Sequence, residues 1–241
     1  MSVPVPTDVR PLFEELGKLA ARHHVRVYAV GGCVRDWCLG IKQGVDVDVT
    51  VEGEGVAFAQ IVVQNLGGTL RVHPPFGTAT IHVSERSLLD IASCRKETYA
   101  RPAAYPSVSA GTLKDDLMRR DFTINAMALS LQSGHFGTLI DLFDGRGDLK
   151  RKQLRVLHPG SFLDDPSRIL RGIRFSQRFG LSWEAETDRH RREAIRAGAL
   201  GWLNAGRLQK ELERMCEEPD PAACLEQLAA FLENDPRCLT C

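Results

Sequence analysis

Two stretches decide the fold: Tyr28-Ala-Val-Gly-Gly-Cys-Val-Arg-Asp36 and, after a short gap, Val45-Asp-Val-Asp-Val-Thr-Val51. The apolar, β-branched residues at 25–30 predict a strand, and the Gly-Gly pair that follows predicts a turn leading into a helix. Apolar residues alternate with Asp and Thr over 45–51, which predicts a second strand. The chain therefore begins with a strand, a turn, a helix and another strand.

The second strand carries two carboxylates, Asp46 and Asp48. Because strand side chains alternate between faces, both project from the same side and form an oxygen-rich site that suits Mg²⁺. The neighbouring Gly31-Gly32 turn exposes backbone N–H groups that can hold phosphate oxygens. Divalent metal beside phosphate is the chemistry of nucleotidyl transfer.

Each piece alone has an ordinary alternative. An isolated Asp-x-Asp is usually a solvated strand edge or loop, and an isolated Gly-Gly is usually only a turn. The ordered combination favours the functional interpretation. It also argues against a dinucleotide-binding fold, because the pattern G-x-G-x-x-G is missing around Gly31.

Composition places the 241 residues among ordinary soluble proteins, with 43% apolar and 26% charged residues. We expect no membrane helix and no signal peptide, because the apolar runs are short and the N-terminus lacks a basic and an apolar region. Seven scattered cysteines indicate reduced thiols and a cytoplasmic protein. Net charge is zero, but residues 145–178 hold nine basic and three acidic residues, a local positive excess that can attract phosphate.

The order of elements predicts an α+β protein. Helices are expected at 9–24 and 55–66, and strands at 25–30, 45–51, 69–72, 78–83, 88–92 and 139–142. The proline-rich segment 95–111 is predicted to be a loop, 113–131 to be helical in its middle, and 144–147 to be a turn. After about residue 160 the pattern is helical. We expect a strand-rich domain at residues 1–150 and an all-α domain at 151–241.

Three further clusters carry chemistry. Asp90 lies on a predicted strand and can support the metal site. In Arg119-Arg120-Asp121-Phe-Thr-Ile-Asn125, two arginines precede an Asp, and Asn125 follows Asp121 by one predicted helical turn, so that both can face one ligand. The alternative is a surface ion pair.

The third cluster opens a predicted helix with Asp164-Asp165-Pro-Ser-Arg168. Asp165 can cap that helix, with proline in its first turn. The helical spacing then gathers four arginines on one cationic face, opposite an apolar face of Ile169, Leu170 and Ile173. The cationic members are Arg168, Arg171, Arg174 and Arg178.

Taken in order along the chain, these motifs resemble the class II tRNA nucleotidyltransferases, the CCA-adding enzymes, and the related bacterial poly(A) polymerases. The resemblance spans residues 28 to about 214, including a weaker match at Arg207-Leu-Gln-Lys-Glu-Leu-Glu-Arg214. It implies a polymerase β-like nucleotidyltransferase head with a mixed sheet flanked by helices at 1–150, and an all-α neck with the start of a truncated body at 151–241.

The resemblance also implies roles for individual residues. Asp46 and Asp48 would be the catalytic carboxylates that hold Mg²⁺, and Asp165 with Arg168 would read the base in place of a nucleic-acid template. Arg120 and Asp121 would read the ribose. The other implied nucleotide-binding residues are Gly31, Gly32, Arg35, Asn125, Arg171 and Arg174. The implied substrates are the tRNA 3′ end with CTP or ATP, and pyrophosphate is released.

Two departures from the family pattern affect the expected activity. Asp164 stands where the family usually has Glu, and the chain ends at Cys241, soon after the weak fifth motif. We therefore expect weak tRNA affinity. Segments 51–55 and 102–106 resemble the split CC-adding and A-adding branch more than the single-enzyme branch. The alternatives are a poly(A) polymerase that accepts any RNA end, and a truncated nucleotide- or RNA-binding remnant.

Overall fold

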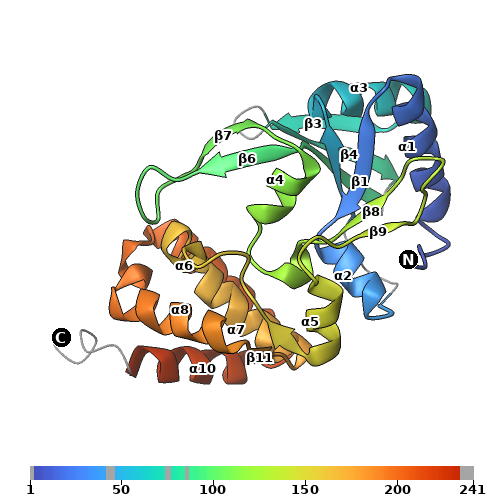
Figure 1. Cartoon of the computed structure of the whole chain (residues 1–241). Helices are drawn as coiled ribbons and strands as arrows, with labels where there is room; N and C mark the ends of the chain where they lie inside the picture. Colours follow the sequence, from blue (N-terminus) through green and yellow to red (C-terminus); the bar gives the residue numbers. More distant parts are fainter. Residues whose placement is uncertain (1–2, 42–46, 74–76, 85–86, 234–241) are drawn as a thin grey trace. The chain divides into compact units, whose positions relative to one another are not determined.

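The computed structural model describes residues 3–41, 47–73, 77–84 and 87–233, and the chain divides into two compact units. The sheet unit consists of Met1–Glu97, Val108–Arg120 and Ile124–Arg146. The helical unit consists of Thr98–Ser107, Asp121–Thr123 and Gly147–Cys241 (Figure 1). Two short segments that precede residue 150 thus belong to the helical unit. No helix in the described part of the chain is long and apolar enough to cross a membrane.

The sheet unit is built on a seven-stranded mixed sheet with the order β3-β4-β5-β2-β1-β8-β9. Among the described pairs of neighbouring strands, β2 with β5 is the only parallel pair, and the others are antiparallel. The strands are β1 (Arg26–Val30), β2 (Val47–Glu52), β3 (Thr69–His73), β4 (Thr78–Ser84), β5 (Ser87–Ser93), β8 (Ala128–Ser130) and β9 (Leu139–Ile140). The predicted mixed sheet flanked by helices is confirmed.

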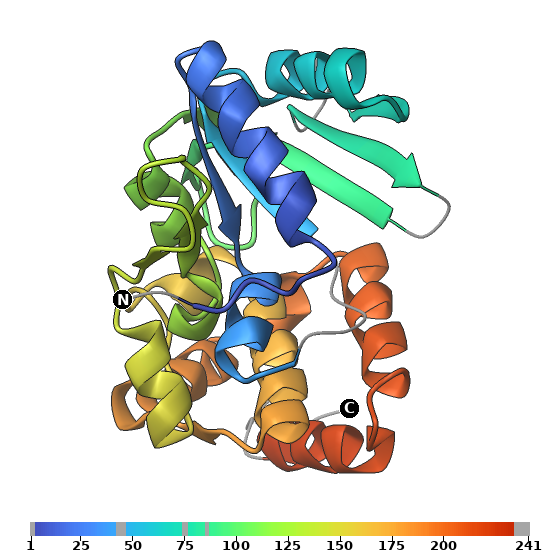
Figure 2. The same cartoon turned by 90° about the vertical axis from the view of Figure 1, so that its right-hand side faces the viewer.

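Two helices, α1 (Arg10–Arg22) and α3 (Gly55–Leu66), contact one face of this sheet and each other (Figure 2). The side chains beneath them are apolar and fully buried, for example Val51, Ile81 and Ile91. Because strand side chains alternate, the polar residues between them turn to the opposite face. That opposite face carries the candidate site.

The remaining elements of the sheet unit differ in part from the sequence-based expectations. Segment 95–111 contains two paired strands, β6 (Arg95–Thr98) and β7 (Ser107–Ala110), instead of a loop throughout. Segment 113–131 is helical at its start, in α4 (Leu113–Met118), continues through a short 3₁₀ turn, η2 (Thr123–Asn125), and ends in strand β8. The prediction of a helical middle is wrong, because α4 ends at Met118 and a turn, a bend and the 3₁₀ turn occupy the middle of the segment.

The helical unit is confirmed as mainly α, with one short pair of parallel strands that sequence analysis missed. Its elements in chain order are α5 (Gly145–Arg151), β10 (Gln153–Leu154), α6 (Ser161–Asp164), α7 (Ser167–Phe179), β11 (Ser182–Trp183), α8 (Ala185–Arg196), η3 (Ala199–Trp202), α9 (Ala205–Cys216) and α10 (Pro221–Glu233). Helix α5 replaces most of the turn that was predicted at 144–147. Its first two residues, Gly145 and Arg146, belong to the sheet unit.

Helix α7 lies at the centre of this unit. Its apolar side, with Leu170 and Ile173, packs against Met215 of α9 and Cys224 of α10. Its glycine, Gly172, leaves room for the aromatic core, because a Cβ there would collide with rings of that core. This core holds α7 in place, and α7 carries most of the arginines that the sequence singled out.

Candidate active site

The central feature of the sheet unit is a pair of carboxylates, Asp48 on β2 and Asp90 on β5. They are register partners in the parallel pairing, they share the face opposite α1 and α3, and both are exposed. Both line a cavity of about 440 Å³. Asp46, the other predicted catalytic residue, lies outside the described residues. The predicted supporting role of Asp90 thus has a geometric basis, because neighbouring strands lie about 4.8 Å apart.

The Gly31-Gly32 turn joins β1 to α2 (Gly32–Cys38), next to the end of β2 that carries Asp48. Gly31 has φ +77°, a region that favours glycine, and its N–H donates to Met127 O at 3.1 Å. A Cβ at position 31 would lie 2.6 Å from Arg120 Nη1. Position 31 is therefore glycine for two reasons, its backbone conformation and the close approach of a guanidinium.

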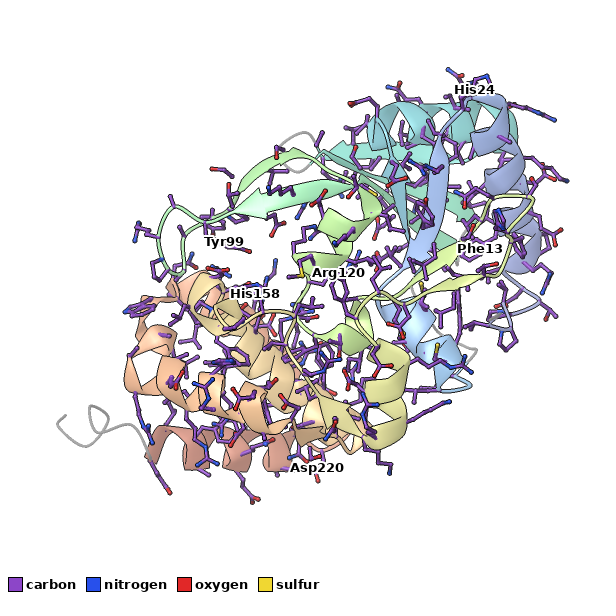
Figure 3. All side chains as sticks on the ribbon, in the orientation of Figure 1. Phe13, His24, Tyr99, Arg120, His158 and Asp220 are labelled. Atoms are coloured by element: carbon purple, nitrogen blue, oxygen red, sulfur yellow. The ribbon has the colours of Figure 1, made fainter. Side chains whose placement is uncertain are left out.

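Arg120 lies at the end of α4 and lines the same cavity (Figure 3). Its Nη2 donates to Asp116 Oδ2 at 3.0 Å. Its Nε is buried and has no hydrogen-bond partner within the part of the chain that the structure describes. A buried donor without a partner costs about 1–3 kcal/mol, so this guanidinium is suited to an anion that enters the cavity.

Asp116, which sequence analysis missed, holds the two consecutive arginines. Its carboxylate accepts from Arg119 Nη2 at 2.7 Å as well as from Arg120. Burial alone would raise the pKa of Asp116, but Arg120 and Arg119 hold that pKa below its ordinary value. The i+3 and i+4 spacing to the two arginines was the available sequence signal.

Arg35 and Asn125, both predicted to bind nucleotide, are brought together in the sheet unit. Arg35 is buried, and its Nη1 donates to Asn125 Oδ1 at 2.7 Å while its Nε donates to Asp36 Oδ1 at 2.8 Å. Next to them, burial and then the charge of Asp48 raise the pKa of the Cys33 thiol to about 12. The Cys33 thiol is therefore neutral and unreactive, and it lies near Asp48.

Asp121 and Asn125 do not form the single helical turn that the sequence predicted. Asp121 belongs to the helical unit, where its Oδ2 accepts from Arg171 Nε at 2.8 Å and from Arg171 Nη2 at 2.5 Å. This pairing raises the pKa of Arg171. Asp121 lies in a bend, and the isolated bridge at Phe122 separates it from the 3₁₀ turn that holds Asn125.

Asp165 stands just before α7 and is held through one oxygen. Its Oδ1 accepts from the backbone N of Ser167 at 3.0 Å, from the Ser167 hydroxyl at 2.6 Å, and from Arg207 Nη2. Its Oδ2 accepts no hydrogen bond from any described residue. Asp165 accepts from the first turn of α7 as expected of a capping residue, but the N-cap position itself is Pro166, one residue later than predicted. Arg207 belongs to the weak fifth motif of the sequence, and its contact with Asp165 was not predicted.

The other member of the predicted base-reading pair, Arg168, is buried, and its Nη1 donates to the Ser161 hydroxyl at 2.6 Å. Arg207 also donates to Ala103 O at 3.4 Å and lies 5.8 Å from the ring centre of Tyr105. The segment at 98–107 is thus fastened to α9 by the same arginine that holds Asp165.

Three of the four arginines on the cationic face predicted for α7, namely Arg171, Arg174 and Arg178, pair with carboxylates. Arg174 is buried, and it donates to Glu218 at 2.8 Å and to Glu211 at 3.1 Å. Arg178 also pairs with Glu218, at 2.7 Å. The local positive excess in the sequence is therefore largely compensated within the folded unit. Arg174 is engaged in this pair of ion pairs, and its contact with a nucleotide stays a prediction.

The chain matches the model of a known protein family. Residues 27–155 match the model of the poly A polymerase head domain. Since the match covers more than half of the chain, the protein belongs to that family.

Two relatives are named as tRNA nucleotidyltransferases. The chain is 40% identical over 230 residues to an A-adding tRNA nucleotidyltransferase of Halalkalibacterium halodurans, which covers 95% of this chain and 54% of the relative. It is 34% identical over 192 residues to a CC-adding tRNA nucleotidyltransferase of Deinococcus radiodurans, which covers 80% and 50%. The chain thus spans about half the length of these curated relatives.

A solved structure shows the same fold. A CCA-adding enzyme in its apo form II superposes with a TM-score of 0.90 at 43% identity, over 94% of this chain and 53% of that one. The predicted family and fold are confirmed.

Proposed function

We propose that this chain carries the nucleotidyltransferase activity of a tRNA 3′-end nucleotidyltransferase. It would add A or C from ATP or CTP and release pyrophosphate. The observation that carries the proposal is the exposed Asp48–Asp90 pair in one cavity with the partnerless Nε of Arg120. In this proposal residues 1–150 are the head and 151–241 the neck, and the protein works in the cytoplasm, where tRNA ends are completed.

The donor set suits a divalent metal, and we propose Mg²⁺. Asp48 and Asp90 offer exposed, hard oxygen ligands on adjacent strands. Among the described residues no group of three or more His, Cys, Asp or Glu is arranged to hold a metal. Mg²⁺ does not require one, since it is commonly bound by one or two carboxylates together with substrate phosphates. When bound, the metal would lower the pKa of the attacking hydroxyl and stabilise the departing charge.

The sheet unit would then position the triphosphate. The Arg120 guanidinium would contact a phosphate oxygen through its partnerless Nε, while Asp116 keeps the guanidinium in place. Gly31 and Gly32 would let the backbone approach the phosphates closely. The 3′-hydroxyl of the acceptor would attack the α-phosphorus in line, forming the new O–P bond as the bond to pyrophosphate breaks. Asp46 is proposed as the second carboxylate of this step.

The helical unit would read the base and the ribose. Asp165 is held by Oδ1, so its Oδ2 is the oxygen that would accept a hydrogen bond from an exocyclic amino group, which C and A carry and U lacks. Arg168 would donate to a ring nitrogen of the same base. Asp121, oriented by Arg171, would accept from the ribose 2′-hydroxyl. A mismatched base would leave such groups unpaired at a cost of about 1–3 kcal/mol each.

We propose A addition first, because the A-adding relative is more similar and covers more of this chain than the CC-adding one. The second candidate is a poly(A) polymerase, which the name of the matching family favours.

The test is nucleotide incorporation with Mg²⁺ on tRNA transcripts that end at the discriminator base, at C or at CC. Each transcript receives ATP, CTP or both. A single A added only to the CC end supports A addition, and two C residues added to the discriminator end identify a CC-adding enzyme. Long A tails on unrelated RNA would identify a poly(A) polymerase. Absence of incorporation by the wild-type chain would contradict the proposed activity.

A further inference from the structure

The cavity of the sheet unit extends beyond the two carboxylates, across β4 to the edge strand β3. Thr80 of β4 is the register partner of Asp90, and His73 of β3 is the register partner of Thr78. Thr78, Thr80 and His73 lie on the face of the sheet opposite α1 and α3 and line the same cavity as Asp48. None of these three residues has a role in the proposed chemistry.

A chain of hydrogen bonds connects this region to the site. Thr80 Oγ1 donates to Asp90 Oδ1 at 2.5 Å, and His73 Nε2 lies 3.3 Å from Thr80 Oγ1. A hydroxyl has one proton, and Thr80 gives it to Asp90, so the contact with His73 requires Nε2 to carry a hydrogen and donate. His73 is thereby fixed in one tautomer and orientation.

The in-line geometry of the proposed displacement places the two substrates on opposite sides of Asp48. In an in-line displacement, the attacking and leaving oxygens lie on opposite sides of the phosphorus. The order of strands puts the Gly31-Gly32 turn on the β1 side of Asp48, and Asp90 on the β5 side. If the leaving pyrophosphate lies against the turn and Arg120, the attacking hydroxyl must come from the side of β5, β4 and β3.

The cavity lining has one feature suited to a nucleotide on that side. Of the described residues that line it, His73 alone has an aromatic ring. The distance from Asp90 across two strand spacings is about 10 Å, which leaves room for a ribose and its base. Unpaired bases at RNA ends are commonly bound by stacking on aromatic side chains, histidine included.

We propose that the β5–β4–β3 side of the cavity is the subsite for the 3′-terminal nucleotide of the acceptor RNA, and that His73 contacts its base. The inference rests on the proposed function, since it takes the nucleoside triphosphate to lie on the other side of Asp48. His73 acts here as a substrate-binding residue and takes no part in the bond-forming step.

The test compares His73→Ala with the wild-type chain on the transcript and nucleotide that the wild type uses. We expect the KM for the acceptor to rise at least about fivefold, the lower end of the effect of removing one stacked aromatic side chain. The affinity for the nucleotide, measured by calorimetry without acceptor, should stay within twofold. His82→Ala is the matched control, because His82 lies on the same face of β4 and does not line the cavity.

An unchanged acceptor KM, or an equal loss of nucleotide affinity, would overturn the subsite while leaving the proposed function in place. No incorporation by the wild type would contradict the proposed function itself. If His73→Ala does not fold, His73→Thr keeps a β-branched residue on the edge strand and makes the same test.

Discussion

The carboxylates of the sheet unit and the arginines of the helical unit are held in contrasting ways. Asp48 and Asp90 are placed by the backbone register of two strands and stay exposed. Arg168 and Arg174 are placed by other side chains, Ser161 or a pair of glutamates, and are buried. Backbone placement puts these carboxylates on an exposed surface, whereas the arginines of the helical unit are held by side-chain partners and contribute to the fold.

The largest expected effect concerns the exposed carboxylates of the sheet unit. Asp48→Asn should lower the rate of incorporation by about 10³-fold, because several kcal/mol of metal-based stabilisation would be lost. The melting temperature should not fall, since the side chain is exposed. Asp8→Asn, also exposed, is the control for a change of one surface charge. A tenfold or smaller loss of rate for Asp48→Asn would show that Asp48 does not hold the metal.

For the buried ion pairs of the helical unit, we expect removal of one partner to lower stability. Glu218 is almost fully buried and pairs with both Arg174 and Arg178. Glu218→Gln should lower the free energy of unfolding by about 3 kcal/mol, because it leaves buried charge uncompensated. Denaturant unfolding measures it, with the exposed Glu213→Gln as control. A change below about 1 kcal/mol would mean that these pairs contribute specificity alone.

Arg207 lies between the two cases, because it holds a residue that is proposed to read the base. Arg207→Lys keeps the charge but cannot contact Asp165 and Ala103 O together in the same way. We expect discrimination of ATP or CTP against UTP to fall about tenfold, with little change in stability. Lys210→Gln on the same helix is the control. Unchanged discrimination, measured by kcat/KM ratios, would separate Arg207 from base reading.

The smallest expected effect concerns two buried thiols of the sheet unit, those of Cys33 and Cys94. Burial raises the pKa of Cys33 and of Cys94 to about 12. At pH 8 we expect iodoacetamide to modify the exposed Cys216 and to spare these two, as peptide mass spectrometry would show. Labelling of Cys33 as fast as Cys216 would contradict its burial.

The same shift sets a direction for stability. The unfolded chain loses a thiol proton near pH 9, while the folded protein holds it to about pH 12. The contribution of Cys33 is therefore complete below pH 9 and is lost as the pH rises toward 12. The midpoint of denaturant unfolding, followed from pH 8 to 11, should fall.

Sequence analysis worked where local pattern decides structure. Helix α3 begins and ends at the predicted residues, and the alternation of apolar and polar residues placed Asp48 on the polar face of its strand. It was wrong for the middle of segment 113–131, where α4 ends at Met118 and the chain turns to reach β8, whose pairing with β1 comes from a distant part of the sequence. Strand β7 is exposed throughout, and β6 alternates half-buried and exposed residues that are all polar, so neither strand shows apolar alternation in the sequence.

The partners of the arginines could not be predicted for a similar reason. Arg171 finds Asp121, Arg174 finds Glu218, and Asp165 finds Arg207, all more than forty residues apart in the chain. Local helical periodicity shows that the arginines share a face, but the tertiary packing decides what that face meets. Asp116 is the exception, because its spacing to the arginines that follow was visible and was not used.

The left-handed backbone at Gly31 has a consequence for how this protein can vary. A side chain at position 31 would need an unfavourable φ and would also displace the Arg120 guanidinium. A single substitution there fails on both counts, and replacing Arg120 alone removes only one of them. Positions 31 and 120, far apart in the gene, are thus expected to be inherited as a unit, with each constraining the changes that selection can accept at the other.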